Sequence, residues 1–258
     1  MRASNVIGEI DFSGQTAIVT GGASGIGREI CDTFAALGAN VAVADIEQGP
    51  AEEAASELEA DHGVEAIPVE TDVSSYDAVT EMVETVDEAF GRIDSLVNNA
   101  GIGESKPFTE TEPDLWEKIV GVCFYGTMNC THAVLPHMID QGDGGAIVNF
   151  ASDSYKGNDP GLAVYGAAKA ANVSLTRTVA HEVGDHGVRV NCLSPGTTKT
   201  PATADWIDEY EDRILESYAL DRIGEPADHA DAVAFLCSDA ADWVTGEVLS
   251  VNGGYIRG

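Results

Sequence analysis

The feature that most constrains the fold of this chain is a regular alternation of short apolar runs with longer amphipathic stretches. Each run is four to six residues long, and the stretches between runs have the length and spacing of helices. Apolar strands that lack a polar alternation are buried on both faces, which requires helices on both sides of a parallel sheet. The runs lie at 16–20, 41–44, 66–69, 95–98, 146–150, 188–192 and 248–251.

This pattern predicts a doubly wound α/β fold of the Rossmann type. No internal repeat, low-complexity tract or linker rich in proline and serine interrupts it, so residues 1–258 are expected to form a single domain. Residues 1–14 lack the apolar core of a signal peptide and are expected to be a polar lead-in. The predicted helices lie at 26–37, 51–61, 75–90, 112–138, 162–184, 204–218 and 227–237.

Charge excludes several classes of partner. The chain has 44 acidic residues against 13 Lys and Arg, a net charge of −31. A nucleic-acid binder that neutralises phosphates needs a basic face, and an anionic membrane would repel this surface. The acids are spread along the whole chain, so their mutual repulsion should destabilise the protein in dilute buffer and be screened in molar salt. We interpret the charge as halophilic adaptation to a salt-rich cytoplasm; an acidic mesophilic protein is the alternative.

The five cysteines are widely spaced and form no Cys-x-x-Cys pair, which favours a reducing cytoplasmic location. The segment 119–139 contains no Asp, Glu, Lys or Arg, but Asn129, His132 and Pro136 make it a poor membrane span. A helix buried inside the protein or between subunits is expected instead. His181 and His186 lie five residues apart, about 140° around a helix, so no metal site is expected.

A glycine-rich turn follows the first predicted strand. Residues 20–27 read TGGASGIG, and Gly21, Gly25 and Gly27 would let the backbone turn tightly and approach a pyrophosphate at a helix N-terminus. Asp45 ends the second strand, where a carboxylate accepts hydrogen bonds from the ribose hydroxyls and repels a 2′-phosphate. No Lys or Arg lies at 22–24 or 46–48. These features predict NAD rather than NADP; an ordinary strand–helix loop is the alternative.

Tyr165 and Lys169 place a phenol and an ammonium four residues apart, on one face of a helix. A free phenol ionises near pH 10 and is a poor base at neutral pH. An ammonium about 4 Å away favours the phenolate by ~4 kcal/mol at an effective dielectric near 20, which makes a general base feasible. Ser152 follows the strand that ends at Phe150 and could hydrogen-bond to the same substrate oxygen. A surface Tyr–Lys pair is the alternative.

With these motifs, the chain resembles the short-chain dehydrogenase/reductase family over essentially its full length. The resemblance implies that Tyr165 is the acid/base, that Lys169 favours its ionised form and holds the nicotinamide ribose, and that Ser152 orients the substrate carbonyl. It also implies a homotetramer in which the predicted helices 112–138 and 162–184 form one interface. Further matching segments are Asp72-Val73, Asn98-Asn99-Ala100-Gly101, Asn191, Ser194-Pro195-Gly196, Thr200, Gly246 and Asn252-Gly253-Gly254.

The resemblance also implies which residues line the cofactor cleft. Asp72 would meet the adenine, and Asn99 and Gly101 would border the cleft. The predicted catalytic residues are Ser152, Tyr165 and Lys169, with no metal. The predicted cofactor-binding residues are Gly21, Ser24, Gly25, Ile26, Gly27, Asp45, Asp72, Val73, Asn99, Ala100, Gly101, Tyr165, Lys169, Pro195, Gly196, Thr198 and Thr200.

One position departs from the family pattern. The family has a fourth catalytic residue, an asparagine in the helix after strand four, and Cys123 stands at that position. A thiol is a weaker hydrogen-bond partner than an amide. A weakened or rerouted proton relay is therefore expected, and Cys123 is not counted among the catalytic residues.

Three further segments, at 106–113, 132–136 and 151–153, resemble dehydrogenases of hydroxyacyl-CoA thioesters, such as the 2-hydroxycyclohexanecarboxyl-CoA dehydrogenases. The activity expected from the resemblance is NAD-dependent interconversion of a secondary alcohol and a ketone, with a hydroxyacyl thioester as substrate. Three alternatives stay open. They are a 3-oxoacyl-acyl-carrier-protein reductase, a sugar or polyol dehydrogenase, and a non-catalytic NAD-binding protein.

Three of the five lysines follow successive strands at similar distances. Lys106, Lys156 and Lys199 each lie six to eight residues beyond a predicted strand end. The carboxyl ends of the strands border the ligand crevice in an open α/β sheet. These lysines are therefore expected to form a cationic rim for an anionic small-molecule substrate, such as the phosphates of an acyl-CoA. The alternative is that they are simply exposed loop lysines.

Overall fold

A seven-stranded sheet forms the centre of the computed structural model, which describes residues 10–157 and 159–255. Its strand order is β3-β2-β1-β4-β5-β6-β7, and every neighbouring pair is parallel. This arrangement confirms the predicted doubly wound α/β fold of the Rossmann type. The strands are β1 (Thr16–Thr20), β2 (Asn40–Asp45), β3 (Ala66–Glu70), β4 (Ser95–Asn98), β5 (Gly145–Phe150), β6 (Val188–Pro195) and β7 (Val248–Val251).

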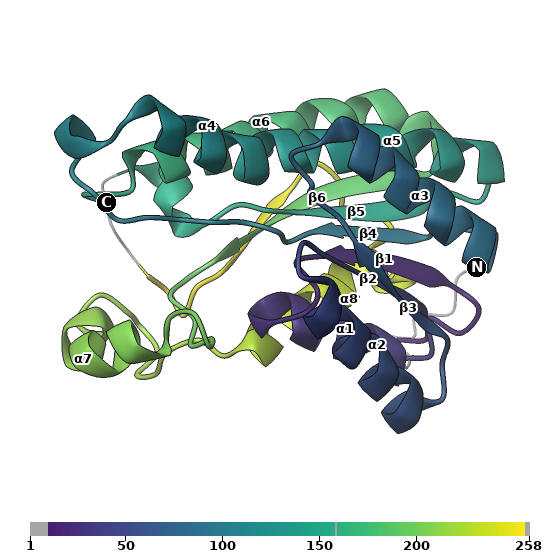
Figure 1. Cartoon of the computed structure of the whole chain (residues 1–258), viewed down its shortest axis with the longest axis horizontal. Coiled ribbons are helices and arrows are strands. Elements are labelled where there is room, and N and C mark those ends of the chain that lie inside the picture. The colour runs from purple at the N-terminus through teal and green to yellow at the C-terminus, as the bar shows by residue number, and fades with distance from the viewer. Residues whose placement is uncertain (1–9, 158, 256–258) are drawn as a thin grey trace.

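Helices cover both faces of the sheet (Figure 1). One layer contains α1 (Gly25–Ala36), α2 (Gln48–His62) and α8 (Pro226–Cys237). The other contains α3 (Tyr76–Phe90), α4 (Pro113–Val120), α5 (Gly126–Gln141) and α6 (Ala163–Val183). The acidic helix α7 (Ala204–Leu215) lies beyond the carboxyl ends of the strands, at the left of Figure 1.

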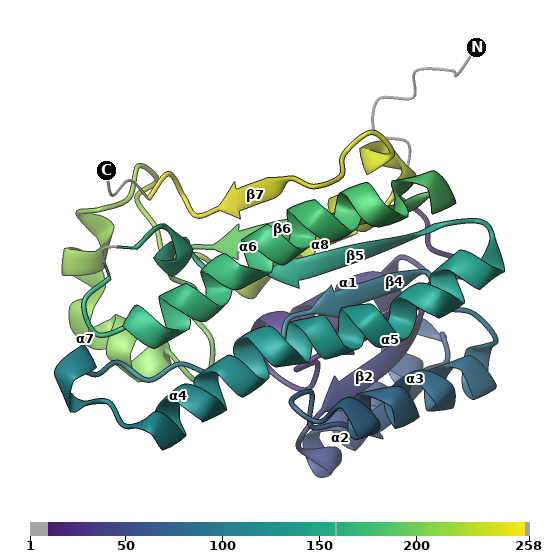
Figure 2. The same ribbon diagram turned by 90° about the horizontal axis from the view of Figure 1, so that it is seen from above.

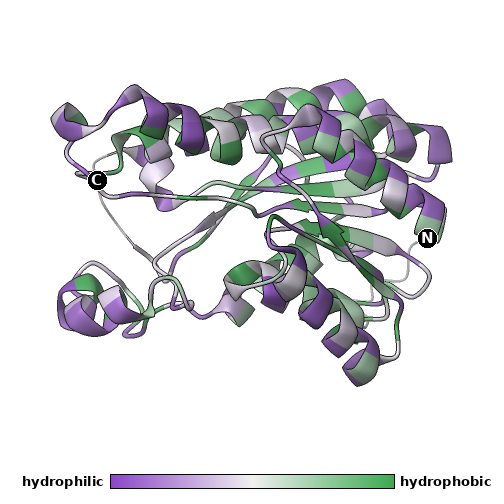
Figure 3. Ribbon diagram, in the orientation of Figure 1, coloured by the Kyte–Doolittle hydropathy of each residue, from purple (hydrophilic) through white to green (hydrophobic). Residues whose placement is uncertain are grey.

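The strands are buried on both faces because each face is covered by a helical layer. Successive side chains of β2 alternate between two cores: Val41 and Val43 pack with residues of α1, α2 and α8, whereas Ala42 packs with residues of α3 and α5. All five residues of β1 are buried. Figure 3 shows the apolar strands between helices whose outer faces are polar. Full burial contributes about 1.5–3 kcal/mol per Val or Ile side chain, which explains why the apolar runs predict the strands.

The helix predicted over 112–138 is divided into three segments, which run as one rod beside α6 (Figure 2). Between α4 and α5, Gly121–Tyr125 forms a π-helical segment. The rod closely approaches the chain after β3 at Gly126, where a Cβ would lie 2.6 Å from Val73 Cγ2. Glycine is therefore required at this crossing. A π segment inserts one residue into the helical repeat, which a 3.6-residue periodicity does not reveal.

The uncharged segment 119–139 lies within this rod. Cys130, Val134 and Met138 are fully buried, so the expected burial inside the protein is confirmed for one face of the helix. Tyr125 and Met128 are exposed on the remaining surface. Among the described residues, no helix has the length and apolar character needed to cross a membrane. All five cysteines are buried and free.

The polar lead-in predicted over 1–14 is partly wrong. Phe12 is 1% exposed and packs against Phe34 of α1, with 5.0 Å between the ring centroids. Its N–H also donates to the carbonyl of Leu37. Phe12 is thus a buried apolar contact within a stretch of mostly polar residues. Residues 1–9 lie outside the described part of the chain.

Candidate active site

The glycine-rich turn joins β1 to α1 in a shape that only glycines allow. Gly21 and Gly25 have φ values of +64° and +55°, and a Cβ on Gly27 would lie 2.0 Å from the carbonyl oxygen of Gly21. At the N-terminus of α1, the Ser24 side chain makes no capping hydrogen bond and no acid lies in the first turn. The helix N-terminus therefore keeps its positive end for an external anion. The cradle fits the pyrophosphate of a dinucleotide.

Residues 99 and 100, after β4, hold this turn in place. Asn99 Nδ2 donates to the carbonyls of Thr20 and Gly21, at 3.0 and 3.1 Å. The N–H of Ala100 donates to Thr20 Oγ1 at 3.1 Å. These bonds attach the end of β4 to the end of β1. The Asn99 side chain thus fixes the backbone of the glycine-rich turn by two hydrogen bonds.

Asp45 lies beside the same turn. Its carboxylate accepts hydrogen bonds from the N–H groups of Ala23 (3.0 Å) and Glu47 (3.1 Å). An ionised carboxylate has about four acceptor sites, so two N–H bonds leave capacity for ribose hydroxyls. Arg28 on α1 is paired with Glu57 at 2.8 Å. Arg28 is therefore engaged with Glu57 of α2 and Asp32 of α1, and the ribose contact of Asp45 stays a prediction.

The Asp72-Val73 pair follows β3. Asp72 Oδ1 accepts from the N–H and hydroxyl of Ser74, at 2.9 and 2.6 Å, in an exposed turn. Val73 is 7% exposed, and its carbonyl accepts from Asn129 Nδ2 at 3.0 Å. The carbonyl of Val73 is thus engaged with α5. The adenine contact of this pair stays a prediction.

The loop after β6 brings further predicted residues to the cradle. Gly196 donates its N–H to the carbonyl of Val251 at 3.0 Å, and a Cβ on it would lie 2.9 Å from Asn252 Cα. Thr200 lies beside the start of α1, because a Cβ on Gly25 would be 3.4 Å from Thr200 Cβ. The loop from Pro195 to Thr200 therefore runs past the cradle, as the cofactor prediction requires.

Thr198 differs from its neighbours because its side chain points into the protein. Its hydroxyl lies 2.6 Å from His229 Nε2 and donates to the carbonyl of Gly196 at 3.0 Å. Burial lowers the pKa of His229 to about 4, so the imidazole is neutral at physiological pH. No motif in the sequence marks His229, because its partner Thr198 lies 31 positions away. The Thr198 hydroxyl is therefore engaged inside the protein and its carbonyl accepts from Thr203 Oγ1 at 2.7 Å, so the cofactor contact of Thr198 stays a prediction.

The three predicted catalytic residues lie around the end of β5. Tyr165 and Lys169 lie on α6, and the Lys169 ammonium is 5.7 Å from the centre of the Tyr165 ring. Lys169 is 2% exposed, and its Nζ donates to the carbonyl of Phe150, the last residue of β5, at 2.9 Å. Ser152 begins the short helix Asp153–Lys156, and its Oγ accepts from the N–H of Ser154 at 3.3 Å. The ammonium is thus anchored to the strand end.

Two glycines let the loop after β4 approach this group. A Cβ on Gly101 would lie 3.4 Å from Lys169 Nζ, and a Cβ on Gly103 would lie 3.6 Å from the Tyr165 ring. Because Asn99 holds the glycine-rich turn, the short segment 99–103 extends from the cradle to the Tyr–Lys pair. One segment of five residues therefore borders both the glycine-rich turn and the Tyr–Lys pair.

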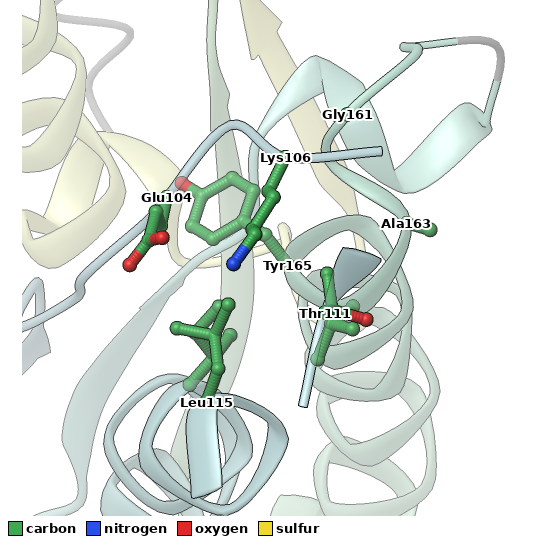
Figure 4. A pocket seen from close by; sticks show the side chains of 9 residues that line it. Glu104, Lys106, Thr111, Leu115, Gly161, Ala163 and Tyr165 are labelled. Carbon is green, nitrogen blue, oxygen red and sulfur yellow. The ribbon is translucent and has the colours of Figure 1, made fainter. Parts of the chain in front are cut away.

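A pocket adjoins Tyr165 (Figure 4). Its walls come from the loop after β4, from α4, and from the start of α6. The lining residues are Glu104, Lys106, Thr111, Leu115, Ile119, Gly161, Ala163, Val164 and Tyr165. Tyr165 thus forms part of the pocket wall, next to Val164 and opposite the loop after β4.

Cys123 lies in the π-helical segment and is fully buried. Its thiol donates to the carbonyl of Ile102 at 3.1 Å and accepts from the Ile102 N–H at 3.4 Å. The thiol therefore holds the loop that leads away from Gly101. The expected rerouting of the proton relay stays a prediction.

Asp153, which no local motif marks as functional, is a structural centre of the site. It is 7% exposed and accepts from Ser194 Oγ at 3.1 Å and Asn252 Nδ2 at 2.7 Å. It also pairs with Lys156 at 2.8 Å. One carboxylate thereby joins the ends of β5, β6 and β7.

Two of the three lysines of the expected cationic rim are paired with carboxylates, and the rim itself stays a prediction. Lys156 is paired with Asp153, and Lys199 with Asp208 of α7. The Asp208 carboxylate raises the pKa of Lys199 by hydrogen bonding and charge. Lys106 differs, because it lines the pocket beside Tyr165.

The sequence and the fold of this chain are similar to those of known dehydrogenases and reductases. A family profile described as enoyl-(acyl carrier protein) reductase matches residues 21–256. The chain is 38% identical to a 3-oxoacyl-[acyl-carrier-protein] reductase of Staphylococcus epidermidis, over 93% of this chain and 98% of that protein. It is 39% identical to a meso-2,3-butanediol dehydrogenase of Serratia marcescens, over 94% and 95% respectively. A short-chain type dehydrogenase/reductase from Mycobacterium marinum superposes with a TM-score of 0.92, at 32% identity and 96% and 98% coverage.

Proposed function

The chain belongs to the short-chain dehydrogenase/reductase family, whose members act on alcohols and ketones, and we propose that it transfers a hydride between NAD and a secondary alcohol or its ketone. The single observation that carries the proposal is the arrangement of Tyr165 and Lys169 beside the glycine cradle. Lys169 is held on the carbonyl of Phe150 at 2.9 Å, 5.7 Å from the Tyr165 ring centre. The bound nicotinamide ring would accept or supply the hydride.

The proton chemistry belongs to the residues of the chain. In the oxidative direction, the Tyr165 phenolate takes the hydroxyl proton of the substrate, and in the reductive direction the phenol returns it. The buried Lys169 ammonium favours the phenolate by its positive charge. Ser152 donates a hydrogen bond to the substrate oxygen. A positioned acid/base contributes about 10²- to 10⁴-fold to the rate.

We infer a preference for NAD from Asp45, and predict that its removal relaxes this preference. The variant Asp45→Ala with Ile46→Arg should raise kcat/KM for NADP⁺ relative to NAD⁺ by about 100-fold, because a repulsive charge is lost and a cation for the 2′-phosphate is gained. Steady-state kinetics with both cofactors measure the ratio. Glu47→Gln, one charge removed two residues away, is the matched control and should leave the ratio nearly unchanged. Equal use of both cofactors by the wild type would contradict the role of Asp45.

The substrate that we propose is a hydroxyacyl thioester. Lys106 on the pocket wall supports it, since an ammonium there can meet an anionic or carbonyl group of the substrate. The named relatives keep other classes open, because they include a diol dehydrogenase and an acyl-carrier-protein reductase. A neutral sugar or polyol would make no use of the Lys106 charge.

A substrate panel in molar KCl tests the proposal. NAD⁺ reduction is followed with hydroxyacyl-CoAs, free hydroxy acids, diols and sugars, and NADH oxidation with 3-oxoacyl thioesters. The highest kcat/KM is expected with a hydroxyacyl-CoA. If a neutral diol or sugar is the best substrate, the thioester proposal is wrong. If NADH-driven reduction of 3-oxoacyl thioesters is faster than NAD⁺ reduction, the protein is a reductase. If NADH binds but no compound is turned over, the protein is not an enzyme of this kind.

We further propose that the protein works as a cytoplasmic homotetramer. The rod formed by α4, the π-helical segment and α5 carries exposed apolar side chains, among them Tyr125 at 49% and Met128 at 37% exposure. Such side chains favour burial against another subunit. The neighbouring helix α6 would complete this interface.

A further inference from the structure

Asn172 is a buried polar residue close to the catalytic lysine that the mechanism above does not use. It lies on α6, three residues after Lys169, and is fully buried. Its Nδ2 is 2.9 Å from the carbonyl oxygen of Cys123, 3.2 Å from that of Phe150 and 3.3 Å from Thr127 Oγ1. Carbonyl oxygens only accept hydrogen bonds, so the NH₂ group must face them.

The carbonyl of Phe150 links Asn172 to the catalytic ammonium. This one oxygen accepts from Lys169 Nζ at 2.9 Å and from the Asn172 amide. The same amide reaches Cys123, in the π-helical segment, where the backbone hydrogen bonds are shifted by one residue relative to an α-helix. The Asn172 amide therefore joins α6, the end of β5 and the π segment at the point where the ammonium is anchored.

Packing alone does not account for an asparagine here. Asn172 Oδ1 is buried and accepts no hydrogen bond from the described residues. A buried acceptor without a donor destabilises a fold, whereas an apolar side chain of similar size would avoid that cost. An asparagine at this position is explained if its NH₂ group has a function that outweighs the destabilisation caused by the unpaired Oδ1.

We propose that Asn172 is a positioning residue, which fixes the acceptor of the Lys169 ammonium and thereby holds this charge beside the Tyr165 phenol. The proposal rests on the proposed dehydrogenase function. Without the amide, the carbonyl of Phe150 and the π segment lose their common partner, and the ammonium can move within its site. The titratable groups near the pair include Cys123 from the π segment, Cys192 of β6, which interacts with the Lys169 charge, and, along the pocket wall, Glu104 and Lys106.

The test compares Asn172→Leu and Asn172→Ala with a matched control on the same helix. Thr176 lies one turn further along α6, is also fully buried, and accepts from Asn149 Nδ2 at 2.9 Å, so Thr176→Val removes a buried hydrogen bond that does not involve Lys169. Both Asn172 variants should lower kcat by about 10- to 100-fold, with KM for NAD⁺ changed less than about threefold. The acidic limb of their pH profile should move up by about one unit. Thr176→Val should reduce only the unfolding midpoint.

A second measurement separates this proposal from the proposed function. Phenolate absorbance in the near ultraviolet, taken as the difference from Tyr165→Phe, reports the ionisation of Tyr165 without any substrate. Its midpoint should move to higher pH in the Asn172 variants and stay in place in Thr176→Val. If the midpoint shifts in the Asn172 variants but the wild-type protein turns over no substrate, the positioning role of Asn172 is supported and the proposed dehydrogenase function is refuted.

Two results would overturn the proposal. One is an unchanged pH profile and phenolate midpoint in folded Asn172 variants. The other is the failure of both Asn172 variants to fold while Thr176→Val folds, because Asn172 would then serve stability alone.

Discussion

Replacing Tyr165 by phenylalanine should lower kcat by about 10³-fold, within the range of 10² to 10⁴ that a positioned acid/base contributes. The ring would still pack beside Gly103, where a Cβ would lie 3.6 Å from it, so the site keeps its shape. Only the group that exchanges a proton with the substrate oxygen is lost. Because the cradle of Gly21, Gly25 and Gly27 is untouched, NADH should still bind. Pre-steady-state turnover and NADH fluorescence titration measure the two quantities separately.

A tyrosine outside the site provides the control for this experiment. Tyr76 on α3 is 45% exposed, and its hydroxyl lies 2.8 Å from His132 Nδ1. Tyr76→Phe removes the same atom and one hydrogen bond far along the chain from α6, so its turnover should equal that of the wild type. Wild-type turnover in Tyr165→Phe would exclude the phenol as the acid/base. Loss of NADH binding together with turnover would show instead that the ring hydroxyl is needed to build the cofactor site.

The strand pattern was predictable because burial on both faces leaves a continuous apolar run. The strands 16–20, 95–98 and 248–251 have the predicted bounds. The strand predicted at 188–192 continues to Pro195, since Leu193 and Ser194 pair with Leu249 and Ser250 of β7. Serine and proline are poor strand formers, so this extension depends on a partner strand that local propensity cannot supply.

The site was predictable where a motif is local and unpredictable where it joins distant segments. The glycine turn and the Tyr–Lys pair each lie within one short stretch, and their spacing indicates a common face. The Asn172 amide is hydrogen-bonded to Cys123, 49 positions away in the sequence, and Asp153 is hydrogen-bonded to Asn252, 99 positions away. One signal for Asn172 was present, namely a polar residue three positions after Lys169 on the same helical face. Its partners became visible only with the fold.

The structure also shows how the excess charge is distributed. The net charge of −31 lies on 12,804 Å² of accessible surface, or one net negative charge per roughly 410 Å². Some acids are paired, as Glu57 is with Arg28 and Asp228 with Arg222. The 13 basic residues cannot pair with 44 acids, and Glu53, Glu84 and Glu88 are exposed on α2 and α3. Most of the acidic charge therefore faces solvent and other acids.

The unfolding temperature should accordingly rise steeply with salt. Between about 0.1 M and 1 M KCl the Debye length falls from ~10 Å to ~3 Å, so repulsion between surface carboxylates is largely screened. We expect a gain of about 3–5 kcal/mol in the free energy of unfolding, which corresponds to a rise in Tm of roughly 10 °C or more for a chain of this size. Thermal unfolding followed by circular dichroism across a KCl series measures the rise.

A charge variant distinguishes screening from the general stabilising effect of concentrated salt. Glu53→Gln, Glu84→Gln and Glu88→Gln together remove three exposed charges without touching a described ion pair. Because repulsion in the folded state is reduced, this triple variant should unfold at a higher temperature than the wild type at 0.1 M KCl and show a shallower dependence on KCl. Sucrose stabilises proteins by exclusion rather than by screening, so it should raise both midpoints equally. A flat KCl curve for the wild type would refute the halophilic interpretation, and parallel curves for the two proteins would assign the rise to salt exclusion instead of charge.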